Sequence, residues 1–225
     1  MSPISPAETN AITKYRERES LISFILYHLL KWLFVSPVMH LFFGCRIYGQ
    51  QNVPRQGKVI VVMNHASDFD PPMISNCVGR PVAFMAKEEL FKNPILAALI
   101  RLYGAYPVKR GAGDRAAIRA ALEALSEGWA TGVFLQGTRT PDGTITAPKL
   151  GAALIAAKSQ AVVLPVSIWG TEKILPKGKK FPRFAPVTVR IGVPLSPPAS
   201  GDRAAMEALT QQCAAIINQM HALGR

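Results

Sequence analysis

A histidine and an aspartate stand five residues apart in the sequence NHASDFDPP. The run before them, KVIVVM at 58–63, is apolar and β-branched, as is typical of a strand buried on both faces. On one continuous helix, the side chains of His65 and Asp70 would point about 140° apart and would not meet. Pro71 disfavours a helical conformation at Asp70 and suits the first turn of a following helix. We therefore expect 64–70 to be a loop at the carboxyl end of a strand, where α/β proteins usually place their sites.

In such a loop, the Asp70 carboxylate could hold the imidazole of His65, fix its tautomer and stabilise its protonated form. The sequence has no GxSxG nucleophile motif, and Ser67 is too close to His65 in sequence to form the usual triad. The pair therefore indicates a general base that activates a substrate hydroxyl group directly. Two alternatives stay open. Asp70 could cap a helix beside a structural histidine, or His65, Asp68 and Asp70 could bind a metal ion, although no further cluster would complete that site.

Two later loops carry positive charge, and each follows another expected strand. The first contains Lys109 and Arg110 and comes directly after an apolar run at 105–108. The second reads Gly-Thr-Arg, at 137–139, and follows an apolar run at 131–135. Such a turn offers backbone N–H groups, a hydroxyl group and a forked guanidinium, which together suit a phosphate. If the strands are parallel, both loops lie at the same edge of the sheet as the His–Asp pair.

Strands are expected to alternate with helices along most of the chain. Apolar runs typical of strands lie at 45–49, 58–63, 82–86, 105–108, 131–135, 162–168 and 187–191. Helical patterns are expected at 114–128, at 150–158 and from about residue 202 onward. The sequence therefore predicts an α/β fold, with a mostly parallel sheet covered by helices on both faces.

The chain is both basic and apolar. Its 225 residues include 26 Lys+Arg against 14 Asp+Glu, for a formal net charge of +12, and 49% of them are hydrophobic. Charged residues make up only 18%, which excludes a charge-rich disordered chain and argues against a nucleic-acid binder with a hydrophilic surface. Both properties suit a protein that works at an anionic lipid surface. Cys45, Cys77 and Cys213 lack metal-binding spacing, which indicates a reducing compartment and no structural metal.

The N-terminal part of the chain divides into two segments. Residues 1–20 form a polar arm of balanced charge without the features of a signal or transit peptide. Residues 21–44 are strongly apolar, but Lys31 interrupts them and Pro37 should kink or end a helix. The stretch before the proline would span about 22 Å, short of the roughly 30 Å of a hydrocarbon core. We predict an interfacial helical membrane anchor with Lys31 and Trp32 near the headgroups; a buried helical hairpin and a single membrane span are the alternatives.

Four blocks follow one another in the sequence: Asn-His-x4-Asp at 64–70, GAYPVKR at 104–110, FLQGTRT at 134–140 and LPVSIWGT at 164–171. In this order they resemble the blocks of the glycerophospholipid acyltransferases, most closely their lysophosphatidic acid acyltransferase (1-acylglycerol-3-phosphate O-acyltransferase) branch. PKLG, at 148–151, resembles the Lys-x-Gly segment that follows the third block. The resemblance extends over about residues 45–195 and rests on the order of the blocks, because each block alone is common.

This resemblance implies that residues 45–225 form an α/β acyltransferase domain. The implied reaction moves a fatty acyl group from acyl-CoA or acyl-carrier protein to the sn-2 hydroxyl of 1-acylglycerol 3-phosphate, giving phosphatidic acid. His65 would be the base that deprotonates this hydroxyl, and Asp70 would orient it. The residues implied to bind substrate, chiefly the acceptor phosphate, are Arg110, Gly137, Thr138, Arg139 and Lys149. No metal or bound cofactor is implied, because the acyl donor is a substrate.

Gln136 departs from the family pattern, which has glutamate at this position. Glutamine keeps the length and the hydrogen-bonding capacity but removes a negative charge beside Arg139, which could alter the choice of acceptor. One alternative is therefore a sibling acyltransferase that uses glycerol 3-phosphate or another lyso-lipid, and another is a catalytically dead membrane-bound scaffold. The implied partners are a lipid membrane surface, a lysophospholipid and the acyl donor, and not nucleic acid. The expected location is the cytoplasmic face of a membrane, in peripheral or monotopic association.

Overall fold

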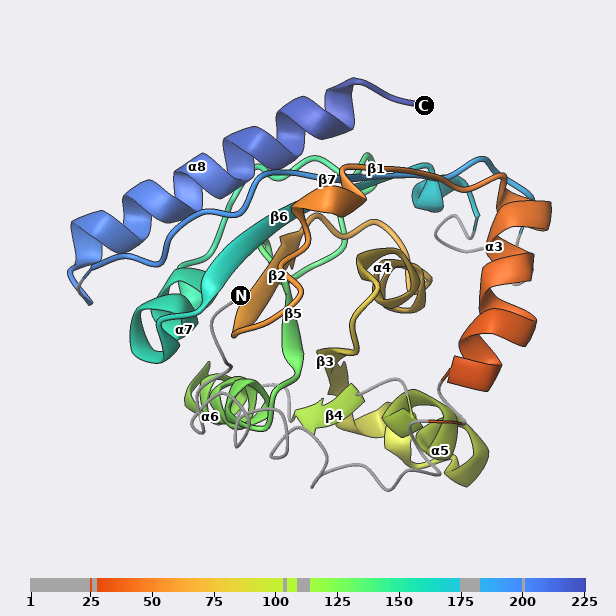
Figure 1. The fold of residues 1–225 in the computed structure, drawn as a ribbon, viewed down its shortest axis with the longest axis horizontal. Helices are drawn as coiled ribbons and strands as arrows, with labels where there is room; N and C mark the ends of the chain where they lie inside the picture. Colours follow the sequence, from red (N-terminus) through yellow and green to blue (C-terminus); the bar gives the residue numbers. More distant parts are fainter. Residues whose placement is uncertain (1–24, 26–27, 103–104, 109–113, 175–182, 200) are drawn as a thin grey trace, which may run out of the picture.

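A computed structural model describes residues 25, 28–102, 105–108, 114–174, 183–199 and 201–225. Its strands are β1 (Arg46–Tyr48), β2 (Val59–Met63), β3 (Val82–Lys87), β4 (Ala105–Val108), β5 (Ala130–Phe134), β6 (Val162–Trp169) and β7 (Thr188–Ile191). Within the described residues these seven form one sheet in the order β1-β7-β6-β2-β5-β3-β4 (Figure 1). Every pairing is parallel except β6 with β7. The mostly parallel sheet expected from the sequence is thus confirmed.

Helices cover both faces of this sheet, as expected. The α-helices are α3 (Ser36–Phe43), α4 (Asp70–Val78), α5 (Pro94–Leu102), α6 (Asp114–Ser126), α7 (Gly151–Ser159) and α8 (Arg203–Ala222). The shorter helices are η1 (Lys31–Val35), η2 (Gln50–Asn52), η3 (Glu88–Phe91) and η4 (Thr171–Lys173). One core cluster joins α3 and α4 to the sheet, and a second joins α6, α7 and α8 to the opposite face. The sequence pattern did not predict α5, because PILAALIRL has no polar face to mark it as a surface helix.

The central strand β2 supports the candidate site. All five of its residues are buried, with Val59, Val61 and Met63 in one core cluster and Ile60 and Val62 in the other. Full burial of each such side chain contributes about 1.5–3 kcal/mol, so both faces hold this strand firmly. Because β2 lies between β5 and β6, the loops that follow these three strands leave the sheet beside one another.

The helix before the sheet has one side in the core and the other exposed. Met39 and Phe43 of α3 are 2% and 8% exposed and belong to the core cluster under α4. Leu41 of the same helix is 80% exposed, and Trp32 in η1 is 63% exposed. The described part of the segment 21–44 therefore packs on the domain along one side only.

Lys31 corrects one detail of the sequence interpretation. Its side chain is only 6% exposed and lies close to Cys77 of α4, so it is not at the headgroup position expected for it. Burial lowers the pKa of the Lys31 ammonium group. In the described part of the chain, no helix has both the length and the apolar character needed to cross a membrane. The polar arm, residues 1–20, lies outside the described residues.

Candidate active site

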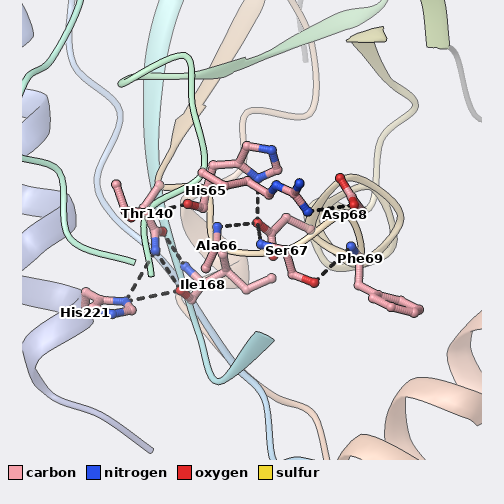
Figure 2. Close-up of polar contacts among 11 residues, drawn as sticks. His65, Ala66, Ser67, Asp68, Phe69, Thr140, Ile168 and His221 are labelled. Atoms are coloured by element: carbon pink, nitrogen blue, oxygen red, sulfur yellow. Dashed lines mark hydrogen bonds and ion pairs between the residues drawn. The ribbon is translucent and has the colours of Figure 1, made fainter. Parts of the chain in front are cut away.

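His65 and Asp70 meet directly in the loop after β2. The Nδ1 atom of His65 lies 2.8 Å from Oδ2 of Asp70. The same Oδ2 accepts hydrogen bonds from the backbone N–H groups of Ala66 (2.8 Å) and Ser67 (2.9 Å). Figure 2 shows His65, Ala66 and Ser67 side by side in this loop. Asp70 is fully buried, whereas the His65 side chain is 16% exposed. The loop folds back because α4 begins at Asp70, with a proline in its first turn.

This geometry fixes the tautomer of His65. A carboxylate oxygen only accepts hydrogen bonds, so Nδ1 carries the proton and donates it to Asp70. In the neutral ring, Nε2 then has the free lone pair. Among the described residues, none forms a hydrogen bond with Nε2, which leaves this atom available to accept a proton from a substrate hydroxyl group.

An aromatic ring holds the plane of the imidazole. Phe134, the last residue of β5, stacks on His65 with ring centroids 3.7 Å apart and planes 18° from parallel. Phe84 of β3 in turn stacks on Phe134, with ring centroids 5.9 Å apart. The sequence reasoning did not assign this role to Phe134. The sheet register explains the contact: Phe134 of β5 pairs with Met63 of β2, and Met63 stands two residues before His65.

Asn64, the first residue of the motif, anchors the loop to β6. Its side-chain Nδ2 donates to the carbonyl oxygen of Ile168 at 2.8 Å, and its Oδ1 accepts from the N–H of Ile168 at 2.9 Å. Asn64 is 1% exposed, so water does not compete strongly for either hydrogen bond. The amide thus fixes the root of the loop that carries His65.

The loop between β5 and α7, residues 135–150, gathers the basic residues expected to bind substrate. Gly137 has φ +73°, a left-handed conformation that disfavours other residues. A Cβ atom on Gly137 would lie 3.2 Å from Nζ of Lys149, so the ammonium group lies directly over this turn. Thr138 and Arg139 follow on the exposed side of the turn. Arg110, the fifth predicted binding residue, lies outside the described residues.

Two contacts join the 135–150 loop to the histidine loop. The backbone N–H of Thr140 donates to the carbonyl oxygen of His65 at 2.9 Å. Nη1 of Arg139 lies 2.7 Å from Oδ2 of Asp68, and both side chains are partly exposed, at 48% and 69%. This ion pair was not anticipated from the sequence. A guanidinium has five N–H donors, so its contact with Asp68 leaves donors for a phosphate.

Asp68 therefore contacts Arg139 and does not join His65 and Asp70. This arrangement differs from the metal site that the sequence left open for these three residues. In the described ranges, no three histidine, cysteine or acidic side chains gather as potential ligands.

The Gln136 side chain joins the two ends of the 135–150 loop by hydrogen bonds. Its Oε1 accepts hydrogen bonds from the backbone N–H groups of Thr146 (2.8 Å) and Ala147 (3.2 Å). A glutamate carboxylate could accept the same two bonds, because both residues present an oxygen at the same side-chain length. The glutamine thus preserves the loop while removing a charge.

We expect Gln136→Leu to weaken the site and Gln136→Glu to preserve it. The leucine variant loses two accepted hydrogen bonds, each contributing about 0.5–1.5 kcal/mol, so the loop should loosen and the acceptor KM should rise. The glutamate variant keeps both bonds. Steady-state kinetics with varied acceptor, together with thermal melts, would measure this. An unchanged acceptor KM in the leucine variant would contradict the proposed role of Gln136.

Residues 44–169 match the family model described as acyltransferase, which covers more than half of the chain. The chain therefore belongs to the acyltransferase family. Its fold is similar to the crystal structure of the 1-acyl-sn-glycerophosphate acyltransferase of Thermotoga maritima, with a TM-score of 0.74 and 28% identity, over 95% of this chain and 87% of the other.

Curated relatives carry related names. The chain is 28% identical over 190 residues to the 1-acyl-sn-glycerol-3-phosphate acyltransferase of Bacillus subtilis, covering 80% of this chain and 92% of the relative. It is 29% identical over 157 residues to a chloroplastic 1-acyl-sn-glycerol-3-phosphate acyltransferase of Arabidopsis thaliana, covering 68% of this chain. The match spans only 44% of the length of this plant relative.

Proposed function

We propose that the chain transfers a fatty acyl group from an acyl thioester, acyl-CoA or acyl-carrier protein, to the sn-2 hydroxyl of 1-acylglycerol 3-phosphate, giving phosphatidic acid. The observation that carries this proposal is the His65 ring. Its Nδ1 is bonded to the buried Asp70 while its Nε2 is open, and the basic 135–150 loop is joined to its backbone. The names of the relatives support the same reaction.

The proposed steps follow from this geometry. Nε2 of His65 takes the proton of the sn-2 hydroxyl group as the oxygen attacks the thioester carbonyl. The ester C–O bond forms, the C–S bond breaks, and the leaving thiolate takes the proton from the imidazolium. Asp70 stabilises the imidazolium through Nδ1, and such general-base assistance contributes roughly 10²- to 10⁴-fold to rates. The donor is a substrate, so these steps call for no resident cofactor.

An assay with purified protein tests the choice of acceptor. The protein is given 1-acylglycerol 3-phosphate, glycerol 3-phosphate or a neutral lyso-lipid, each with a CoA donor and with a carrier-protein donor. The proposal predicts the highest kcat/KM with 1-acylglycerol 3-phosphate. Preference for glycerol 3-phosphate would establish the sibling activity, and transfer to a neutral lyso-lipid at an equal rate would contradict phosphate recognition by this site.

We expect Arg139→Ala to raise the acceptor KM more than the donor KM. A guanidinium–phosphate contact exists in the bound ground state as well as in the transition state, so its loss weakens binding in both. Asp68→Asn is the matched control, because it removes the carboxylate that pairs with Arg139 and keeps the guanidinium. The control should leave the acceptor KM equal or lower. If only the donor KM moved in the arginine variant, Arg139 would belong to the donor site.

The exposed apolar residues support a membrane-bound location. The lipid-facing surface proposed here consists of Trp32, Leu33, Val38, Leu41 and Phe42 on η1 and α3, Ile95, Leu96 and Leu99 on α5, and Phe184. Figure 1 shows α3 and α5 on the same side of the sheet. Lys31 is 6% exposed while its neighbours Trp32 and Leu33 are each 63% exposed, so apolar side chains take the exposed positions of η1. We infer that this surface contacts the cytoplasmic face of a membrane in peripheral or monotopic association.

Charge is placed to assist this contact. Phe184 stacks on Phe42 with ring centroids 5.4 Å apart, which brings the neighbouring Arg183 to the edge of the lipid-facing surface. Arg183 and Lys173 belong to a basic cluster that consists of Lys173, Lys177, Lys179, Lys180 and Arg183. Lys177, Lys179 and Lys180 lie outside the described residues. Basic side chains beside an apolar surface are attracted to anionic lipids.

We expect Leu41→Glu combined with Ile95→Glu to reduce binding to vesicles that contain anionic lipid. The two substitutions place charge on the most exposed apolar positions of α3 and α5, at 80% and 82% exposure, without touching the core. Val193→Glu is the control, because Val193 is 68% exposed and follows Gly192, which packs beside Pro165 of β6 and Ile216 of α8. Vesicle flotation measures binding. Equal binding of the double variant and the control would contradict the assignment of this surface.

A further inference from the structure

The C-terminal helix α8 reaches the candidate site, although it lies outside the matched region 44–169. Its apolar side packs on β6 and α7. Two polar side chains at its end, one turn apart, point instead toward the loops of the site. We propose that Asn218 and His221 are positioning residues that set the 135–150 loop against the loop of His65. This inference rests on the proposed function.

Asn218 holds the middle of the 135–150 loop. Its Oδ1 accepts from the backbone N–H of Ile145 at 2.9 Å, and its Nδ2 donates to the carbonyl oxygen of Ile145 at 2.8 Å. Both backbone groups of one loop residue are thus bonded to one side chain. The side chain of Ile145 is 5% exposed and packs in the core cluster that contains α8, so the loop is held by packing as well.

His221 contacts both loops at once. Its Nε2 lies 2.8 Å from the carbonyl oxygen of Asp142, so Nε2 carries a proton and donates it. Its Nδ1 lies 3.4 Å from Nδ2 of Asn64 and 3.1 Å from the carbonyl oxygen of Ile168. Figure 2 shows the ring extending from α8 to Ile168. Nδ1 thus faces Asn64, the residue that precedes the proposed base, and the same Ile168 carbonyl oxygen to which Asn64 donates.

The backbone around this contact leaves no space for a further side chain. Gly143 has φ +74°, and a Cβ atom there would lie 2.7 Å from Cε1 of His221 and 3.1 Å from Nδ2 of Asn64. Three segments that are distant in the sequence therefore meet closely at this glycine. Asn64 leads directly into His65, and Gly143 follows Arg139 by four residues.

The consequence concerns the distance between base and phosphate. In the proposed reaction, Nε2 of His65 must reach the sn-2 hydroxyl while Arg139 and Lys149 hold the phosphate of the same molecule. A displacement of about 1 Å between such groups costs as much as roughly 10²-fold in rate. α8 fixes Asn64, which precedes the base, and the turn at 142–145, which lies between Arg139 and Lys149. It thereby keeps the distance from Nε2 of His65 to the phosphate-binding residues constant.

The experiment compares His221→Ala with His221→Gln and with Gln219→Ala, an exposed substitution on the same helix. Glutamine can still donate a hydrogen bond toward the Asp142 carbonyl. We expect the alanine variant to lose about 10-fold or more in kcat/KM for 1-acylglycerol 3-phosphate, with the donor KM unchanged. The glutamine variant should recover part of this loss, and Gln219→Ala should match the unaltered protein. Asn218→Ala, tested alongside, should act in the same direction.

Hydrogen exchange supplies a readout that does not depend on activity. Amides of residues 140–147 should exchange faster in His221→Ala and in Asn218→Ala, while the amides of β2 and β6 keep their protection. Unaltered kinetics and exchange in both variants would overturn the inference, as would faster exchange throughout the chain, which indicates general unfolding. If the unaltered protein transfers no acyl group to 1-acylglycerol 3-phosphate, the proposed function fails, and the exchange data still test the contact.

Discussion

Replacing His65 with alanine is expected to lower the turnover number of acyl transfer by roughly 10²- to 10⁴-fold, because the variant lacks the general base. The fold should survive this change. The His65 side chain is partly exposed, and without it Asp70 still accepts hydrogen bonds from two backbone N–H groups. Steady-state kinetics with saturating donor and acceptor measure the loss.

A thermal melt and vesicle flotation of the same variant supply the control, and both should match the unaltered protein. Turnover close to that of the unaltered protein would remove His65 from the mechanism. A lost melt transition would mean that this variant cannot decide the question. In that case, His65→Gln offers a polar side chain of similar size that is not a general base.

Asp70→Asn is expected to reduce turnover about as severely while preserving the fold. The amide oxygen of asparagine can take the place of Oδ2 and accept from Ala66 and Ser67, and its NH2 group can occupy the place of Oδ1, which has no hydrogen-bond partner. A neutral oxygen stabilises the His65 imidazolium far less than a carboxylate does. The kinetic loss should therefore appear with only a small change in melting temperature.

Asp70→Ala separates the catalytic role of Asp70 from its structural one. This variant leaves two backbone N–H groups without their acceptor, which costs about 1–3 kcal/mol for each buried group. Its free energy of unfolding, from denaturant titration, should fall well below that of the asparagine variant. Equal stability of the two variants would show that Asp70 does not hold the loop, and full activity of Asp70→Asn would contradict its role beside His65.

The sheet could be predicted from sequence because each strand has a local signature. β2 reads as a run of β-branched and apolar residues, and burial on both faces requires such a run. The meeting of His65 and Asp70 was also predictable, because Pro71 suits the first turn of a helix and so makes the chain before Asp70 a loop that can fold back. Both inferences depend on residues that are close in sequence.

The remaining contacts depend on residues that are distant in sequence, and no local pattern encodes them. Asn64 bonds to Ile168 across 104 positions, and Arg139 pairs with Asp68 across 71 positions. Lys31 shows the same limit: a helical wheel groups it with other polar residues but does not say whether that stripe faces the core or the outside. The sequence did carry a signal for His221, because it is a polar residue at the edge of the apolar stripe of α8.

The most direct test of the central claim is the position at which the acyl group is attached. Purified protein is incubated with 1-acylglycerol 3-phosphate and a donor whose acyl chain is labelled, and the product is cleaved by an sn-2-specific phospholipase. The proposed mechanism predicts labelled phosphatidic acid whose label is released entirely from the sn-2 position, formed at least about 100-fold more slowly by His65→Ala. Label recovered only as free fatty acid, or equal phosphatidic acid from His65→Ala, would contradict the proposal.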